Sequence, residues 1–130
     1  ISILQKNGIL VGLVSGGFSP IVERLAKYLG ISHFSANQLE VKDGFLTGRL
    51  VGEIVTGQVK KATLEKWRTE LELPKERTIA IGDGANDLLM LKSAGHSIAF
   101  CAKEVVKAEI ACHVDTRDFL EVLPLIDFLE

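Results

Sequence analysis

Short runs of apolar residues alternate along the chain with longer stretches in which apolar positions recur every three or four residues. A run rich in β-branched residues and leucine predicts a strand at 9–14, and a second apolar run predicts one at 78–81. Two further short strands are expected at 97–100 and 112–114. The amphipathic stretches predict helices, at 20–29, 58–73, 85–94, 103–110 and 119–129. Strands that alternate with helices favour right-handed crossovers and a parallel sheet covered on both faces. We therefore predict an α/β fold with a three-layer, Rossmann-like parallel sheet.

Serine, proline and glycine mark where several of these elements are expected to begin or end. Ser15-Gly16-Gly17 predicts a tight turn after the first strand, and Ser19 with Pro20 predicts the N-cap and first residue of the next helix. One face of that helix gathers the residues expected to be buried, Ile21, Val22, Leu25 and Leu29. Gly30 is expected to end the helix. Asp43-Gly44 lies between two segments of alternating polarity and predicts a β-hairpin inserted in the α/β fold.

Composition narrows the class of protein. With 130 residues, 47% of them hydrophobic, and 12 glycines, the chain fits a single domain, 1–130, with a buried core. Its 15 basic and 17 acidic side chains give a net charge of −2, which offers no electrostatic footprint for nucleic acid or an anionic membrane. No run approaches the ~20 apolar residues of a membrane span. Cys101 and Cys112 are too few for a disulfide scaffold and indicate reduced thiols in the cytoplasm.

Two acidic residues follow a predicted strand, at the edge where open α/β sheets bind their ligands. Asp83 lies in Gly82-Asp83-Gly84, directly after the strand at 78–81, and Asp87 lies in the first turn of the next helix. At this spacing both carboxylates are expected to face one crevice. Close carboxylates repel unless a cation joins them, so the pair predicts Mg²⁺, a hard oxygen-binding ion, and a basic partner. A turn that binds nothing is the alternative, because Asp, Gly and Asn dominate turns.

The first strand is followed by residues suited to an anion. Ser15 offers a hydroxyl donor and Gly16 an unobstructed N–H, ahead of a helix N-terminus, although a simple glycine turn is the alternative. A lysine that could hold a phosphoryl group opens the helix at 58–73, as Lys60 or Lys61, and the pattern does not choose between them. A dinucleotide-binding loop fails at Asp87, which stands where the third glycine is required.

Three strings are specific enough to compare with known families. They are Val14-Ser15-Gly16-Gly17-Phe18, the segment from Val41 to Gly48, and Ile81-Gly82-Asp83-Gly84-Ala85-Asn86-Asp87-Leu88. In this order they resemble the second motif, the hairpin insertion and the fourth motif of the haloacid dehalogenase-like superfamily of phosphotransferases, and most closely those of its phosphoserine phosphatases. The resemblance covers essentially all 130 residues. It implies a Mg²⁺-dependent phosphomonoesterase that hydrolyses O-phospho-L-serine to serine and phosphate, through an aspartyl-phosphate, in serine biosynthesis.

The resemblance also implies a role for each matching residue. Ser15 would hydrogen-bond the phosphoryl group, helped by the backbone of Gly16, and Asn86 would contact the substrate. Lys60, rather than its neighbour, matches the motif lysine and would neutralise phosphoryl charge, with Asp87 orienting it. Phosphoryl transfer depends mostly on such positioning and charge neutralisation, so these roles agree with the chemistry of the residues.

The metal ligand is matched, but the nucleophile is not. Asp83 corresponds to the family's Mg²⁺ ligand, whereas the first motif, an Asp-x-Asp pair that holds the nucleophile, has no counterpart here, and neither has the helical cap. The chain begins at Ile1 and its one methionine is Met90. We therefore expect an N-terminal segment of the same protein to supply these parts. The core of this chain is then expected to be incomplete, with open edges on the strands at 9–14 and 78–81. The chain is also expected to be inactive on its own.

Three alternatives stay open on sequence grounds. The same chemistry could act on another small phosphomonoester or transfer the phosphoryl group to an alcohol, because the absent cap decides the substrate. A non-catalytic module could keep the anion pocket. The P-domain of a cation-pumping ATPase carries a related fourth motif, but it requires flanking membrane segments.

Overall fold

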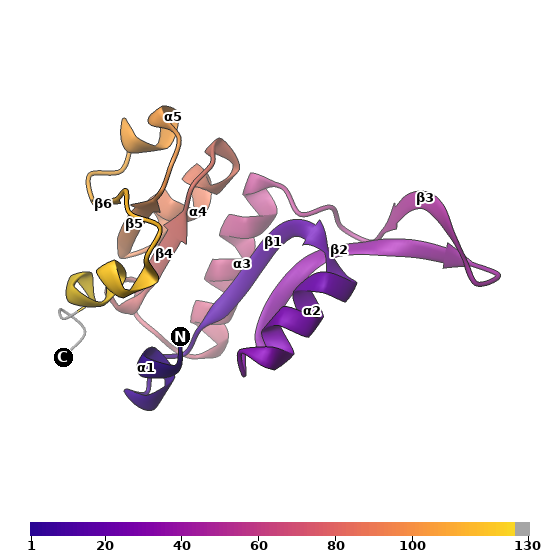
Figure 1. Cartoon of the computed structure of the whole chain (residues 1–130), viewed down its shortest axis with the longest axis horizontal. Helices are drawn as coiled ribbons and strands as arrows, with labels where there is room; N and C mark the ends of the chain where they lie inside the picture. The colour runs from indigo at the N-terminus through magenta and orange to yellow at the C-terminus, as the bar shows by residue number, and fades with distance from the viewer. Residues whose placement is uncertain (127–130) are drawn as a thin grey trace. The chain divides into compact units, whose positions relative to one another are not determined.

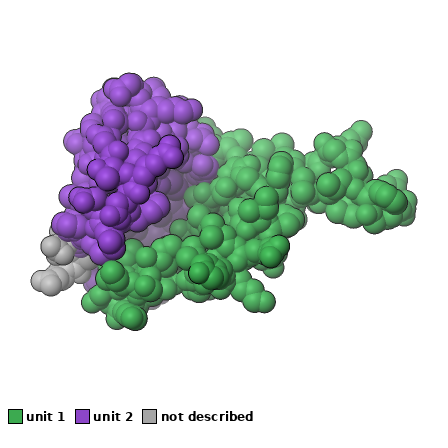
Figure 2. All heavy atoms as spheres, in the orientation of Figure 1, with its two compact units in different colours: residues 1–59 green, residues 60–130 purple. Residues whose placement is uncertain are grey.

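A computed structural model describes residues 1–126. The chain divides into two compact units, unit 1 with residues 1–59 and unit 2 with residues 60–130 (Figure 2). Each unit contains one three-stranded sheet of the described strands, and both sheets include parallel pairs. The predicted α/β fold with parallel strands is therefore confirmed. No helix among the described residues is long and apolar enough to cross a membrane.

Unit 1 is built on a strand, a helix and a hairpin. Its elements are α1 (Ser2–Lys6), β1 (Gly12–Phe18), α2 (Ser19–Tyr28), β2 (His33–Lys42) and β3 (Phe45–Val51). β1 pairs in parallel with β2, and β2 pairs antiparallel with β3 (Figure 1). Among the described strands β1 is therefore at an edge, with β2 as its one partner.

The Ser15-Gly16-Gly17 segment is not the tight turn that was predicted, but part of β1. The strand continues to Phe18, which pairs with Asn37 of β2, and its register with β2 shifts along this segment. The strand runs through both glycines, and neither has a positive φ. The N-cap of α2 is consequently Phe18 rather than Ser19, which is the first helical residue.

α2 presents a narrower apolar face to unit 1 than predicted. Val22 and Ala26 are buried, whereas Ile21 is 70% exposed and Leu25 is 47% exposed. Because each helical residue turns by about 100°, Ile21 and Leu25 lie beside the buried row and not within it. Gly30, with φ of +66°, follows the C-cap and ends the helix as predicted, in the conformation that glycine adopts most easily there.

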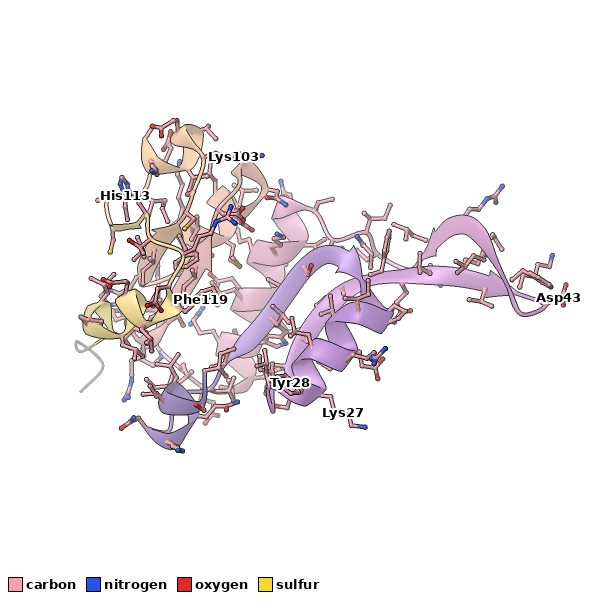
Figure 3. All side chains as sticks on the ribbon, viewed as in Figure 1. Lys27, Tyr28, Asp43, Lys103, His113 and Phe119 are labelled. Carbon is pink, nitrogen blue, oxygen red and sulfur yellow. The ribbon has the colours of Figure 1, made fainter. Side chains whose placement is uncertain are left out.

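The Asp43-Gly44 turn joins β2 to β3 as predicted. Both residues have positive φ, 52° and 82°, as in the two-residue turns that match the twist of antiparallel strands, and Asp43 marks the tip (Figure 3). The Thr47 hydroxyl donates to the Glu40 carboxylate across the strands, at 2.6 Å. The hairpin extends beyond the β1–β2 pair (Figure 1).

Unit 2 contains the second sheet, with parallel strands in the order β4-β5-β6. Its elements are α3 (Gly57–Glu70), which spans the boundary between the units, η1 (Lys75–Arg77), β4 (Ile79–Gly82), η2 (Ala85–Asp87), α4 (Leu88–Ser93), β5 (His96–Phe100), α5 (Glu104–Lys107), β6 (His113–Val114) and η3 (Phe119–Leu125). Leu91, Ile98 and Val106 are fully buried and form the centre of its core.

Two helices of unit 2 differ from their predictions. The helix expected at 103–110 is the four-residue α5, and the chain from 119 to 125 is a 3₁₀-helix that contains Pro124. A proline inside an α-helix removes a hydrogen bond, which favours the tighter, shorter form. The remainder of the predicted closing helix, 127–129, lies outside the described residues.

Gly95, which follows α4, fits closely against the backbone of η1. A Cβ at this position would lie 2.2 Å from the Lys75 carbonyl oxygen and 2.7 Å from Cα of Glu76. The Thr78 hydroxyl fixes the same place, because it donates to the Lys75 carbonyl and accepts from the Gly95 N–H, at 2.6 and 2.9 Å. Backbone atoms cannot yield as a side-chain end can.

We therefore expect Gly95→Ala to lower the free energy of unfolding by about 1–3 kcal/mol or more in urea denaturation. Gly16→Ala is the control, because a Cβ at Gly16 would meet nothing closer than 3.9 Å, and its stability should stay within about 0.5 kcal/mol of wild type. Equal stabilities for the two variants would contradict the close fit at Gly95.

Candidate functional site

Lys60 and Asp87 form a buried ion pair in unit 2. The Lys60 Nζ lies 2.7 Å from Asp87 Oδ1, and the two side chains are 8% and 7% exposed. Lysine is almost never buried unless it is paired. Lys61, the other candidate that the sequence left open, is exposed. The lysine that contacts the acidic loop is therefore Lys60, which the family resemblance had selected.

The loop that carries Asp87 wraps around its carboxylate. Oδ2 accepts hydrogen bonds from the amides of Asp83 and Gly84, at 3.0 and 3.2 Å. A Cβ at Gly82 would lie 2.5 Å from Cβ of Asp87, so only glycine allows this close approach. Three donors thus hold one carboxylate, and its negative charge is balanced by Lys60.

These donors change how readily Asp87 takes up a proton. Burial alone would raise the pKa of Asp87, but the hydrogen bond from Lys60 and those from the Gly84 and Asp83 amides outweigh it and hold the pKa below its ordinary value of 3.8. The folded state therefore binds this proton less readily than the unfolded chain. The resulting stability is complete above the unfolded pKa and is lost as pH falls through the folded one.

Acid is accordingly expected to destabilise the wild type more steeply than Asp87→Asn. Asparagine does not titrate, so the slope of the free energy of unfolding against pH should be smaller for the variant, below about pH 5. Urea denaturation at several pH values between neutral and strongly acidic conditions measures both slopes. Identical slopes would mean that the Asp87 carboxylate gains nothing from its donors in the fold.

Asp83 and Asn86 occupy the outer side of the same loop. Both residues are exposed. The Asp83 backbone is fixed on both sides, because its N–H donates to Asp87 and its carbonyl accepts from the Lys103 N–H at 2.9 Å. The side-chain oxygen of Asn86 lies over Gly84, 2.8 Å from where a Cβ of that glycine would stand. The structure thus brings Lys60, Asp87 and the Asp83 backbone together.

The two carboxylates have different surroundings, although the sequence predicted one shared crevice that a cation would have to bridge. Asp87 is neutralised by Lys60 and does not itself require a metal. Asp83 is exposed and offers an oxygen ligand of the kind that Mg²⁺ prefers. No cluster of three or more His, Cys, Asp or Glu residues that could hold a metal ion occurs within residues 1–126. Asp83 therefore fits as one ligand of a Mg²⁺ site, not as part of a complete set.

Ser15 and Gly16 lie in unit 1, near the end of β1. Ser15 is half-buried, and its Oγ accepts a hydrogen bond from the Gly17 N–H at 2.9 Å. The Gly16 carbonyl accepts from the side-chain amide of Asn37 at 2.9 Å. Asn37 also accepts from the Val55 N–H, at 2.7 Å. Sequence reasoning missed Asn37, because no strand was predicted over this residue, whereas β2 begins at His33.

The chain is similar to proteins and solved structures of one known family. The phosphoserine phosphatases of Streptococcus thermophilus and Lactococcus lactis are 52% and 46% identical to this chain, over 124 and 129 residues. These alignments cover 95% and 99% of this chain, and 58% and 60% of the two proteins. The crystal structure of a phosphoserine phosphatase in its apo form gives a TM-score of 0.91 at 42% identity, and covers 96% of this chain and 62% of that one.

The chain thus spans about 60% of the length of the curated relatives that it matches. The family model of haloacid dehalogenase-like hydrolases matches residues 1–92, more than half of the sequence. That range includes β1, the hairpin, Lys60 and the Asp83–Asp87 loop. On this evidence the chain belongs to the haloacid dehalogenase-like hydrolases.

Proposed function

We propose that this chain is part of a Mg²⁺-dependent phosphoserine phosphatase, which hydrolyses O-phospho-L-serine to L-serine and phosphate. The observation that carries the proposal is the buried contact between Lys60 Nζ and Asp87. Asp87 belongs to a loop whose sequence resembles the family's fourth motif. A desolvated ammonium is suited to neutralise the oxygens of a phosphoryl group. The names of the relatives support the choice of phosphoserine as substrate.

Each unit would contribute residues to this activity. From unit 1, the Ser15 hydroxyl and the Gly16 backbone would hydrogen-bond the phosphoryl group. From unit 2, Lys60 would neutralise its charge and Asn86 would contact the substrate. Asp87 accepts from the Lys60 ammonium, so it would hold the lysine in place without touching the substrate itself. We propose that the two units act as one phosphatase core.

Asp83 would be this chain's ligand to Mg²⁺. Its exposed carboxylate, on a backbone anchored by two hydrogen bonds, suits a hard divalent ion. Bound Mg²⁺ would polarise a phosphoryl oxygen and orient the group for transfer. The other ligands would come from outside the described residues.

The nucleophile would come from outside these 130 residues. No Asp-x-Asp pair occurs in the sequence, and the relatives are longer than this chain. We propose that an N-terminal segment of the same protein supplies an aspartate that forms an aspartyl-phosphate, together with the cap that selects the substrate. Both cysteines are free thiols, which suits a protein of the reducing cytoplasm. The L-serine that the reaction releases would be the product of serine biosynthesis.

A panel of phosphomonoesters tests the proposed substrate. The full-length protein is expected to release phosphate from O-phospho-L-serine faster than from other small phosphomonoesters, in the presence of Mg²⁺, and to lose this activity in EDTA. A preference for another phosphomonoester would keep the chemistry and overturn the substrate. Phosphate release unaffected by EDTA would overturn the metal requirement.

The isolated 130-residue chain is expected to be inactive. It contains Lys60, Asp83 and Asp87 but no candidate for the attacking aspartate. Phosphoserine hydrolysis by the purified chain, measured beside the full-length protein with Mg²⁺, provides the test. Turnover that is sensitive to EDTA would contradict the proposal that the nucleophile lies elsewhere.

A further inference from the structure

Asn37 is the buried polar residue at the centre of the sheet in unit 1. It lies on β2 and is 6% exposed. Its Oδ1 accepts from the Val55 N–H at 2.7 Å, and its Nδ2 donates to the Gly16 carbonyl at 2.9 Å. Because the backbone N–H can only donate and the carbonyl can only accept, these two partners fix which way the side-chain amide points.

The hydrogen bonds continue beyond Gly16 to Ser15. The Gly16 carbonyl and the Gly17 N–H belong to the same peptide group, which is planar, so its carbonyl and N–H point in opposite directions. When Asn37 holds the carbonyl, it therefore also aims the N–H. That N–H donates to Ser15 Oγ at 2.9 Å.

The three hydrogen bonds run in one direction, from Val55 through Asn37 and the Gly16–Gly17 peptide to the Ser15 hydroxyl. Hydrogen bonds in such a series polarise one another. The Ser15 oxygen accepts the last of them, so one side of the hydroxyl is occupied. Its proton is then directed away from Gly17 and is available to an anion.

We propose that Asn37 is a positioning residue, which acts through the Gly16–Gly17 peptide to orient the Ser15 hydroxyl as a donor to phosphate. This inference rests on the proposed function, because it requires Ser15 to bind the phosphoryl group. Asn37 itself does not touch the substrate. The alternative is that Asn37 only stabilises unit 1, by satisfying two backbone groups.

The test uses Asn37→Asp in the full-length protein. Aspartate keeps an oxygen for the Val55 N–H but cannot donate to the Gly16 carbonyl when ionised. The matched control is Gln38→Glu, the same amide-to-carboxylate change at the next residue of β2, which is exposed. Asn37→Ser is a second variant in case Asn37→Asp does not fold. Urea denaturation confirms that each variant is folded before assay.

The main readout is the inhibition constant of inorganic phosphate, measured with kcat and KM for phosphoserine. Asn37→Asp is expected to weaken phosphate binding by about tenfold, the scale of one hydrogen bond to a charged group, and Gln38→Glu is expected to leave it unchanged. If Asn37 acts through Ser15, Asn37→Asp should add nothing in a Ser15→Ala background, since residues that act as a unit are not additive.

Two outcomes would overturn the inference, and they are distinguishable. If Ser15→Ala weakens phosphate binding while Asn37→Asp does not, or adds its full effect on top of Ser15→Ala, the positioning role is wrong and the proposed function stands. If Ser15→Ala leaves the inhibition constant of phosphate unchanged, both the role of Ser15 and that of Asn37 fail.

Discussion

Replacing Lys60 by methionine is expected to lower the free energy of unfolding by about 3–5 kcal/mol, the range for removal of one partner from a buried ion pair. Methionine keeps the length and most of the apolar stem of lysine, so the change removes the ammonium and little else. The Asp87 carboxylate would then be 7% exposed without its cation. The two amides that donate to Oδ2 would remain, but they carry no net charge. Urea denaturation at neutral pH measures the loss.

Lys61→Met is the matched control for this variant. Lys61 is the next residue of α3 and is exposed, so its replacement should change the stability by less than about 0.5 kcal/mol. Comparable losses for the two variants would show that a general effect of the helix, and not the buried pair, is being measured. A Lys60 variant as stable as wild type would mean that the pair does not hold the loop.

The second large effect is expected on activity alone. Asp83→Asn in the full-length protein should reduce kcat/KM for phosphoserine by about 100-fold or more. Replacing a residue that only supports a metal ligand already costs about 10–100-fold in metal affinity or activity, and a ligand itself should cost at least as much. It should nevertheless leave the stability within about 0.5 kcal/mol. The reason is that Asp83 makes its observed hydrogen bonds through its backbone, to Asp87 and from Lys103, while the residue is exposed.

The concentration of Mg²⁺ that gives half-maximal activity shows whether Asp83 binds the metal ion. For Asp83→Asn this concentration should rise strongly, whereas for Asp118→Asn, a change at another exposed acid of unit 2, it should stay the same. A variant at Asp83 that keeps wild-type activity at limiting Mg²⁺ would remove this residue from the metal site.

Much of the fold could be predicted because the decisive signals are local. Asp43-Gly44 adopts the positive φ angles that a two-residue hairpin requires, and Gly30 ends α2 in the left-handed conformation. These residues carry their conformational preference with them. β4 and β5 were also indicated locally, by the short and mostly apolar runs at 78–81 and 97–100.

Other features depend on tertiary contacts that no local pattern contains. Ser15-Gly16-Gly17 has turn residues, yet β1 continues through them and pairs with β2 again at Phe18. The apolar periodicity of α2 does not say that Ile21 stays exposed in unit 1 while Ala26 is buried. Contacts with neighbouring elements, rather than intrinsic propensity, decided both cases.

Part of the candidate site was likewise predictable from the sequence, and part of it was not. The spacing of Asp83 and Asp87 predicted an acidic loop at a strand end, but it could not tell that one carboxylate is buried against a lysine and the other exposed. Choosing Lys60 over Lys61 required either the family resemblance or the geometry. Asn37 was missed because its role lies in two backbone groups, at Gly16 and Val55, that are far from it in the sequence.

The most direct measurement is the rate of phosphate release from O-phospho-L-serine, with Mg²⁺, by the full-length protein carrying Lys60→Met or Lys61→Met, under conditions in which circular dichroism shows both to be folded. If the buried ammonium stabilises the transferring phosphoryl group, the Lys60 variant should lose about 100- to 1,000-fold in kcat, the scale of one electrostatic donor, while the Lys61 variant keeps wild-type activity. A folded Lys60 variant that is as active as the Lys61 variant would contradict the proposal that the Lys60 ammonium stabilises the phosphoryl group.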